Sequence, residues 1–199
     1  FCPTSIEFNA PPKFQSGTRS QLRAMNIAYS AMSGVAPVNV WAELYEHRNE
    51  YIYFRTDHHW TQRGAYYGYV AFCKTAGIKH HDLSEYQTYT VPDFVGTMYY
   101  YTKNYPQGSV LKQNPDFVEV FRPVSNSTMT VYKDSTLTNG KEFPVILSEA
   151  SAQKLGQSAK YMMFIGGDNP ISQIVNHTVD NGRVLIVTKE RSEEHTSEL

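Results

Sequence analysis

The segment Arg55-Thr56-Asp57-His58-His59-Trp60 places a carboxylate, two imidazoles and an indole next to one another. In an extended segment residues i and i+2 point the same way, so we expect Asp57 and His59 to face one cleft and His58 to face elsewhere. A carboxylate beside an imidazole is the base-and-orienter half of a nucleophilic triad, in which the Asp fixes the tautomer and the His takes a proton from a hydroxyl. The spacing predicts catalytic roles for Asp57 and His59.

Two other interpretations of this motif stay open. A His–Asp hydrogen bond at the start of a helix explains the same spacing about as well, and Trp60 is either part of the core or a platform for a sugar ring. Asp-His-His is also the motif of manganese-dependent DHH phosphoesterases. Those proteins need further aspartates, usually a pair upstream, and here no Asp precedes Asp57. The metal-dependent phosphoesterase is therefore the less favoured alternative, and we predict no metal site and no cofactor.

The elements that position the motif are a strand before it and a helix after it. The apolar run Tyr51–Phe54 predicts a buried strand. Thr61 is a candidate N-cap and Gly77 a candidate C-terminal stop for a helix whose apolar face holds Ala65, Tyr69, Phe72, Cys73 and Ala76. Ligands of open α/β sheets bind beyond the carboxyl ends of strands, and the motif lies at such an end.

The rest of the chain predicts an α/β fold with a mainly parallel sheet flanked by helices. A helix is expected over residues 18–32, a buried strand over Tyr161–Ile165 and a parallel strand over Arg183–Thr188. Residues 86–147 are expected to form a β-rich insertion, in which 117–121 and 128–132 pair as a hairpin. The run Gly166-Gly167-Asp168-Asn169 is either a second loop of the site or a plain turn before Pro170.

Composition excludes two classes of protein. The 199 residues carry 18 Lys and Arg against 19 Asp and Glu, a net charge of −1, which argues against a basic nucleic-acid binder. Mean hydropathy is −0.46, and no apolar run approaches the ~20 residues of a membrane span. A hydrophobic content of 41% is enough for a core, so disorder is not expected.

Residues 53–61, with Gly64-Ala65 following, closely resemble the signature of the DHHW family of bacterial envelope-associated proteins. The family resembles the SGNH-like O-acetyltransferases that modify exopolysaccharides such as alginate. The resemblance spans most of residues 3–190. It implies an SGNH-hydrolase-like fold and a Ser-His-Asp mechanism in which Asp57 and His59 are catalytic. His58, Trp60, Asp168 and Asn169 are candidate substrate-binding residues.

The same resemblance implies partners and a location. The partners are a glycan or polysaccharide substrate and an unidentified acyl donor, with no nucleic acid. The parent protein is expected outside the cytoplasm, in the cell envelope or secreted, and a membrane anchor would precede Phe1. The alternative is a non-catalytic glycan-binding or polysaccharide-assembly module.

The nucleophile that the resemblance implies is missing from its expected position. It is a Ser that follows a Lys-Asp/Glu pair after a late strand, but Lys189-Glu190 is followed here by Arg191. Residues 191–199 look like the translation of a sequencing adapter. We therefore expect residues 1–190 to be a partial domain, incomplete at both ends and inactive by itself.

Overall fold

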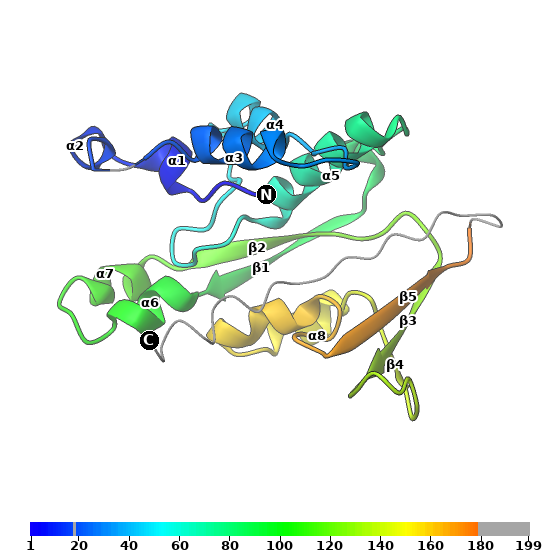
Figure 1. The fold of residues 1–199 in the computed structure, drawn as a ribbon. Coiled ribbons are helices and arrows are strands. Elements are labelled where there is room, and N and C mark those ends of the chain that lie inside the picture. Colours follow the sequence, from blue (N-terminus) through cyan, green and yellow to red (C-terminus); the bar gives the residue numbers. More distant parts are fainter. Residues whose placement is uncertain (18, 179–199) are drawn as a thin grey trace.

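The computed structural model describes residues 1–17 and 19–178, and forms two small antiparallel sheets with helices around them (Figure 1). The elements are α1 (Ile6–Asn9), α2 (Pro12–Gln15), α3 (Gln21–Ser30), α4 (Val40–Glu46), α5 (Gln62–Ala76), the 3-10 helix η1 (Leu83–Glu85), β1 (Thr88–Phe94), α6 (Thr97–Thr102), α7 (Gly108–Gln113), β2 (Asp116–Phe121), β3 (Ser127–Tyr132), β4 (Lys141–Phe143), α8 (Glu149–Gln153), the 3-10 helix η2 (Gln157–Met163) and β5 (Ile171–Asn176). Strand β1 pairs with β2, and β3 lies between β4 and β5. Helix α5 packs on β2 and α8 on β1, from opposite sides of this pair (Figure 1).

The expected SGNH-hydrolase-like, mainly parallel sheet is wrong for the described residues, because every strand pair among them is antiparallel. The segment Tyr51–Phe54 joins neither sheet and contributes a single bridge, from Tyr53 to Trp60. Most of the predicted strand Tyr161–Ile165 lies in the 3-10 helix η2 or just beyond it. The predicted strand Arg183–Thr188 lies outside the described residues.

The physical reason for the first error is that a buried loop and a buried strand have the same apolar sequence. Residues 51–54 fold back on the motif, where Thr61 N–H donates to the Ile52 carbonyl at 2.9 Å and Phe54 N–H to the His59 carbonyl at 3.3 Å. Ile52 packs in a core cluster with α4 and α5, whereas Phe54 packs in a second cluster with β1 and β2. The segment is thus buried between helices and a two-stranded sheet, without parallel neighbours.

The helix after the motif is confirmed as α5. The hydroxyl of Thr61 accepts from the Gly64 N–H at 3.2 Å, which is the predicted N-cap, and Gly77 ends the helix with φ +67°. Side chains at Gly64 would overlap the Ile52 carbonyl, so this glycine lets the helix start close to residues 51–54. The local sequence therefore determines where the chain leaves the motif.

The expected hairpin is wrong, although both of its strands form. Residues of β2 pair with β1, in a register that includes Val91 opposite Val118, and β3 pairs with β4 and β5. Residues 86–147 thus contain β1 to β4 together with α6 and α7. Alternating apolar residues predict that a strand forms, but the choice of partner depends on segments far away in the chain.

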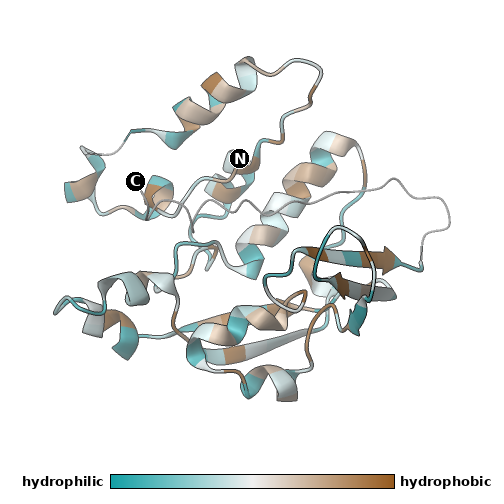
Figure 2. Cartoon of the chain, turned by 60° about the horizontal axis from the view of Figure 1, so that its bottom comes forward, coloured by the Kyte–Doolittle hydropathy of each residue, from teal (hydrophilic) through white to brown (hydrophobic). Residues whose placement is uncertain are grey.

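The N-terminal helix prediction is confirmed in a shorter form, as α3, with Ser20 as N-cap and Met25 buried. Hydrophobic and hydrophilic residues both occur along the helices, as expected where one helix face is buried and the other is exposed (Figure 2). In the part of the chain that the structure describes, the helices are all too short or too polar to cross a membrane.

Candidate functional site

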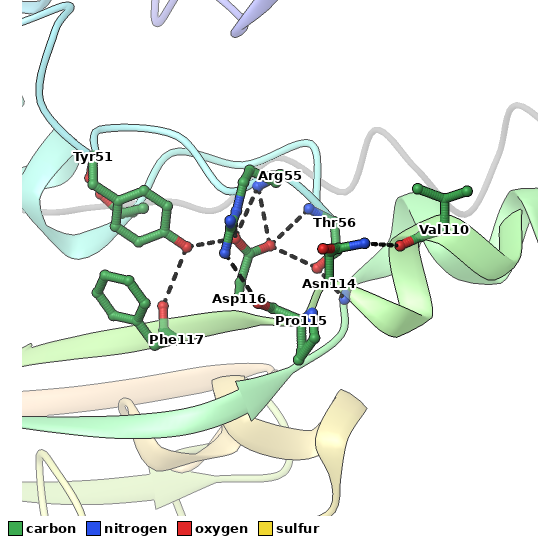
Figure 3. Close-up of polar contacts among 10 residues, drawn as sticks. Tyr51, Arg55, Thr56, Val110, Asn114, Pro115, Asp116 and Phe117 are labelled. Atoms are coloured by element: carbon green, nitrogen blue, oxygen red, sulfur yellow. Dashed lines mark hydrogen bonds and ion pairs between the residues drawn. The ribbon is translucent and has the colours of Figure 1, made fainter. Parts of the chain in front are cut away.

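The first half of the motif is bound by the buried carboxylate of Asp116 at the start of β2 (Figure 3). The backbone N–H groups of Arg55 and Thr56 donate to Asp116 Oδ2 at 3.0 and 2.7 Å, and the Thr56 hydroxyl donates at 2.7 Å. Its Oδ1 accepts from Arg55 Nε at 3.0 Å and from the Tyr51 hydroxyl at 2.6 Å. A buried carboxylate is tolerated where donors satisfy both oxygens, as they do here.

Sequence reasoning missed Asp116, because it lies far along the chain from the motif and nothing in Pro115-Asp116 marks it. Its effect reaches Tyr51, since burial and the hydrogen bond to Asp116 raise the pKa of Tyr51 far above its ordinary value. The Tyr51 hydroxyl therefore keeps its proton and stays a donor. Asp116 fixes the position at which residues 57–60 begin.

The second half of the motif brings the two predicted catalytic residues into contact. Oδ1 of Asp57 lies 2.5 Å from Nδ1 of His59 and accepts the His59 backbone N–H at 3.0 Å. The side chain of Asp57 is 3% exposed and that of His59 is 36% exposed. The arrangement pairs a buried carboxylate with an imidazole that reaches the surface.

The ionisation of Asp57 follows from its partners. Burial alone would raise the pKa of Asp57, but hydrogen bonds from the His59 ring and from the backbone N–H groups of Thr97 and His59 outweigh burial and hold the pKa well below its ordinary value. The carboxylate is thus an acceptor at neutral pH and places the proton of a neutral His59 on Nδ1. Nε2 of His59 is then the basic nitrogen, as a general base requires.

The turn between β1 and α6 binds the other oxygen of Asp57. Oδ2 accepts the Thr97 backbone N–H at 2.8 Å and the Thr97 hydroxyl at 3.1 Å. A Cβ at Gly96 would overlap the Asp57 carboxylate, so glycine permits this close approach. Gly96 N–H donates to the Thr56 hydroxyl at 3.0 Å, which links the two halves of the motif. Neither Gly96 nor Thr97 has a local sequence signal that could have identified it.

The expectation that His58 faces away from the pair is wrong. Its Nδ1 lies 2.6 Å from the Thr97 hydroxyl oxygen, and its ring centre lies 3.9 Å from that of His59. Residues 55–59 form successive bends, so the two-residue alternation of an extended strand does not apply to them. The structure therefore gathers Asp57, His58 and His59 in one group.

Trp60 lies against helix α5. A Cβ at Gly68 would overlap the indole ring of Trp60, and Trp60 packs on the core cluster that contains Leu44 and Ile52. Packing accounts for these contacts, and a role of Trp60 in substrate binding stays a prediction.

Tyr161 forms a wall of the site that the sequence did not predict. Its ring centre lies 5.6 Å from that of His59, and its hydroxyl donates to the Trp60 carbonyl at 3.4 Å. Burial, with the carboxylates of Asp57 and Asp116 nearby, raises the pKa of Tyr161 far above its ordinary value. A neutral phenol thus encloses the inner side of His59.

Asp168 and Asn169 lie in the turn before β5 and were predicted to line the site. Gly166 and Gly167 have positive φ there, and Asn169 Nδ2 donates to the Ile165 carbonyl at 2.9 Å. Asp168 is exposed and Asn169 is half-buried. Within the described residues, the hydrogen bonds of Asn169 go to the Ile165 and Gly167 carbonyls and to the hydroxyl of Ser172 at the start of β5. These contacts are those of a turn, and substrate binding by Asp168 and Asn169 stays a prediction.

A metal ion is a second chemical use of the same group, because Asp57, His58 and His59 offer ligand atoms within 4.8 Å of one another. In the structure both oxygens of Asp57 and both Nδ1 atoms are engaged in hydrogen bonds with each other or with Thr97. A cation that used those atoms would have to replace these bonds. The geometry therefore favours the acid–base use of the pair.

Comparison with known proteins gives a family and one solved structure. The family described as DHHW protein matches residues 3–196. A crystal structure of a DHHW family protein from Eubacterium siraeum shares 33% sequence identity with this chain, with a TM-score of 0.75. The match covers 88% of this chain and 56% of that protein. No curated protein matches the chain.

Proposed function

The chain belongs to the DHHW protein family, and on this basis together with the geometry of Asp57 and His59 we propose an acyl-transfer function. In the whole protein the pair is the acid–base part of a Ser-His-Asp site that acts as an O-acetyltransferase or esterase on cell-envelope or exopolysaccharide glycans. The relationship to SGNH-like O-acetyltransferases that this implies is one of site chemistry, because the strands in residues 1–17 and 19–178 pair only in antiparallel fashion.

The observation that carries the proposal is the 2.5 Å contact between Asp57 Oδ1 and His59 Nδ1. A purely structural His–Asp pair gains nothing from an imidazole that reaches solvent, whereas a general base must be reachable by its substrate. His59 is 36% exposed while its partner is buried, which supports a role in proton transfer.

The proposed reaction has two steps. His59 takes the proton of a Ser hydroxyl as the Ser oxygen attacks the acetyl carbonyl, and the imidazolium then protonates the leaving group of the donor. In the second step His59 takes a proton from a sugar hydroxyl or water, which attacks the acetyl-serine and releases the free Ser. Asp57 stabilises the imidazolium in both steps without itself taking the proton.

The nucleophile, the acyl donor and the location belong to the whole protein. We place the Ser after Lys189-Glu190, where this chain has Arg191. The glycan substrate leads us to propose a location in the cell envelope or outside the cell.

The experiment that tests the proposal restores the Ser and uses a fluorophosphonate probe that labels activated serines. We expect the variant R191S to be labelled and the matched control R191A to stay unlabelled. The double variant R191S/H59Q should react roughly 100-fold more slowly than R191S, because a positioned base contributes about that much or more. Labelling of R191S that is no faster than R191A, or that ignores H59Q, would contradict the proposal.

A second candidate is a non-catalytic glycan-binding module, which is favoured by exposed tyrosines beside the site. Tyr100, Tyr101 and Tyr105 are 41%, 68% and 65% exposed, on α6 and the turn that follows it, and α6 begins at Thr97. Exposed tyrosines present an apolar face and a hydroxyl, as sugar rings require. Polysaccharide binding that is lost in Y101A/Y105A and unchanged in H59Q, without labelling of R191S, would favour this module.

A further inference from the structure

We propose that Thr97 is a positioning residue through which the Asp57 carboxylate also orients His58. Asp57 would then set the tautomers of two neighbouring imidazoles, His59 by direct contact and His58 through the Thr97 hydroxyl. The three contacts that carry this proposal are Asp57 Oδ1 to His59 Nδ1 at 2.5 Å, Thr97 Oγ1 to Asp57 Oδ2 at 3.1 Å and His58 Nδ1 to Thr97 Oγ1 at 2.6 Å.

The argument rests on the number of protons at the Thr97 oxygen. A hydroxyl has one proton to donate and can accept through its lone pairs. An ionised carboxylate accepts only, so the Thr97 proton is directed to Asp57 Oδ2. The contact between Thr97 Oγ1 and His58 Nδ1 then requires the nitrogen to be the donor. A neutral His58 is thereby held with its proton on Nδ1.

Two contacts disfavour the opposite hydrogen bond, in which the Thr97 hydroxyl would donate to His58 Nδ1. If the Thr97 hydroxyl donated to His58, its lone pairs would face the Asp57 Oδ2 lone pairs at 3.1 Å in a part-buried position. His58 Nδ1 also lies 3.8 Å from Asp57 Oδ1, and a nitrogen lone pair there would be repelled by the carboxylate while an N–H is attracted. Both contacts select the same tautomer.

The consequence for catalysis rests on the proposed function. Both rings are held through Nδ1, with centres 3.9 Å apart and planes tilted by 38°. Each ring therefore directs its Nε2 away from Asp57 and Thr97. In the proposed reaction His59 takes the proton in both steps, and an oriented His58 beside it has the role of hydrogen-bonding the acceptor sugar hydroxyl.

The tautomers can be read from side-chain nitrogen shifts of the ¹⁵N-labelled chain, with no need for activity. At about pH 9, well above the ordinary His pKa of about 6.5, we expect His58 and His59 both to carry the proton on Nδ1. In T97V, the share of His58 that carries its proton on Nδ1 should fall, because the contact with the hydroxyl at 2.6 Å is lost while the weaker attraction of Asp57 Oδ1 at 3.8 Å stays, and His59 should keep its own tautomer. T97S should restore the His58 tautomer. The control T102V, which removes a hydroxyl bonded to the Met98 carbonyl in the same helix, should change neither.

The proposal is overturned if the share of His58 that carries its proton on Nδ1 is the same in T97V as in the unaltered chain, or if T97S folds without restoring it. It is also overturned if His58 in the unaltered chain carries its proton on Nε2. The readout does not depend on R191S, so an expected tautomer pattern without labelling of R191S would reject the acyl-transfer function and leave the role of Thr97 intact.

Discussion

Asp116 and Asp57 are two buried carboxylates, 2% and 3% exposed, that bind the two halves of one motif. The donors to Asp116 are backbone N–H groups, two hydroxyls and the guanidinium of Arg55, which are types of group that do not change their charge near neutral pH. Asp57 instead binds the imidazole of His59, the type of side chain that can take up or release a proton near neutral pH. Burial therefore does not distinguish a catalytic carboxylate from a structural one, whereas the partner does.

The largest effect is expected at Asp116. The substitution D116A leaves the buried N–H and hydroxyl of Thr56 and the part-buried N–H of Arg55 without an acceptor. At about 1–3 kcal/mol for each unsatisfied buried group, it should lower the free energy of unfolding by about 3–5 kcal/mol. Urea unfolding followed by circular dichroism measures it. The matched control E142Q removes an exposed carboxylate on β4 and should stay within about 0.5 kcal/mol. A loss at D116A as small as that of the control would mean that Asp116 does not hold the motif.

At Asp57 we expect a substitution to lower stability less than D116A does, and to slow the reaction with the probe strongly. The substitution D57N should cost about 1–3 kcal/mol, less than D116A, because the exposed edge of His59 keeps its contact with water. In the R191S background it should slow probe labelling by roughly 10⁴-fold, the loss seen when the orienting Asp of a triad becomes Asn. If D57N cost as much stability as D116A and left labelling unchanged, the distinction between the two carboxylates would fail.

The pH dependence of stability should also separate Asp57 from its amide variant. Asp57 has a lower pKa in the folded chain than in the unfolded chain, where it is about 3.9. Its stabilising contribution is therefore complete above about pH 5 and is lost as the pH falls through the folded-state pKa. Urea unfolding at a series of pH values should show the gap between the unaltered chain and D57N closing below pH 5. A gap that stays constant down to about pH 2 would contradict this.

A substitution at Gly96 tests how closely the residues before α6 pack against the Asp57 carboxylate. The substitution G96A places a Cβ against the Asp57 carboxylate and should cost about 1–3 kcal/mol, as overpacking does. It should also shift the His59 ring resonances. Gly156 is the matched control, since a Cβ there meets no atom within 4 Å. Equal effects of G96A and G156A would mean that the turn before α6 is free to move away from Asp57.

The comparison also explains what the sequence could and could not predict. Thr61 and Gly77 delimit α5, because caps and stops are local signals. Asp57 and His59 were paired from spacing alone, and their contact requires nothing outside the motif. Asp116 and Thr97 reach the motif from β2 and α6 through pairing of β1 with β2, and no local pattern encodes such a contact.

The errors have the same origin. The run Tyr51–Phe54 has the composition of a central strand, yet its burial comes from α4, α5 and the β1–β2 pair. The orientation of His58 was predicted from strand alternation, which fails in a bent loop. Periodicity describes regular backbone, whereas the candidate site of this chain lies on irregular backbone that is held by polar groups from distant parts of the sequence.

The smallest loss of stability is expected for a substitution of Arg55. This measurement bears most directly on the difference between Asp116 and Asp57. The Arg55 side chain is 60% exposed, so its ion pair with Asp116 is screened by water, and R55M should cost less than about 1 kcal/mol. The substitution keeps the Arg55 backbone N–H, which donates to the same carboxylate at 3.0 Å. The cost, measured by urea unfolding, should shrink further at high salt.

A loss at R55M close to that of D116A, with strong salt dependence, would mean that the charge of Arg55 holds Asp116. Asp116 and Asp57 would then both depend on a cationic partner, and the difference between them would be one of degree. A small loss places the stabilisation in the uncharged donors of Thr56, Tyr51 and the backbone. Those donors keep their protons throughout the pH range in which an ordinary imidazole gains or loses one, so the loop that carries the proposed acid–base pair should stay in place across that range.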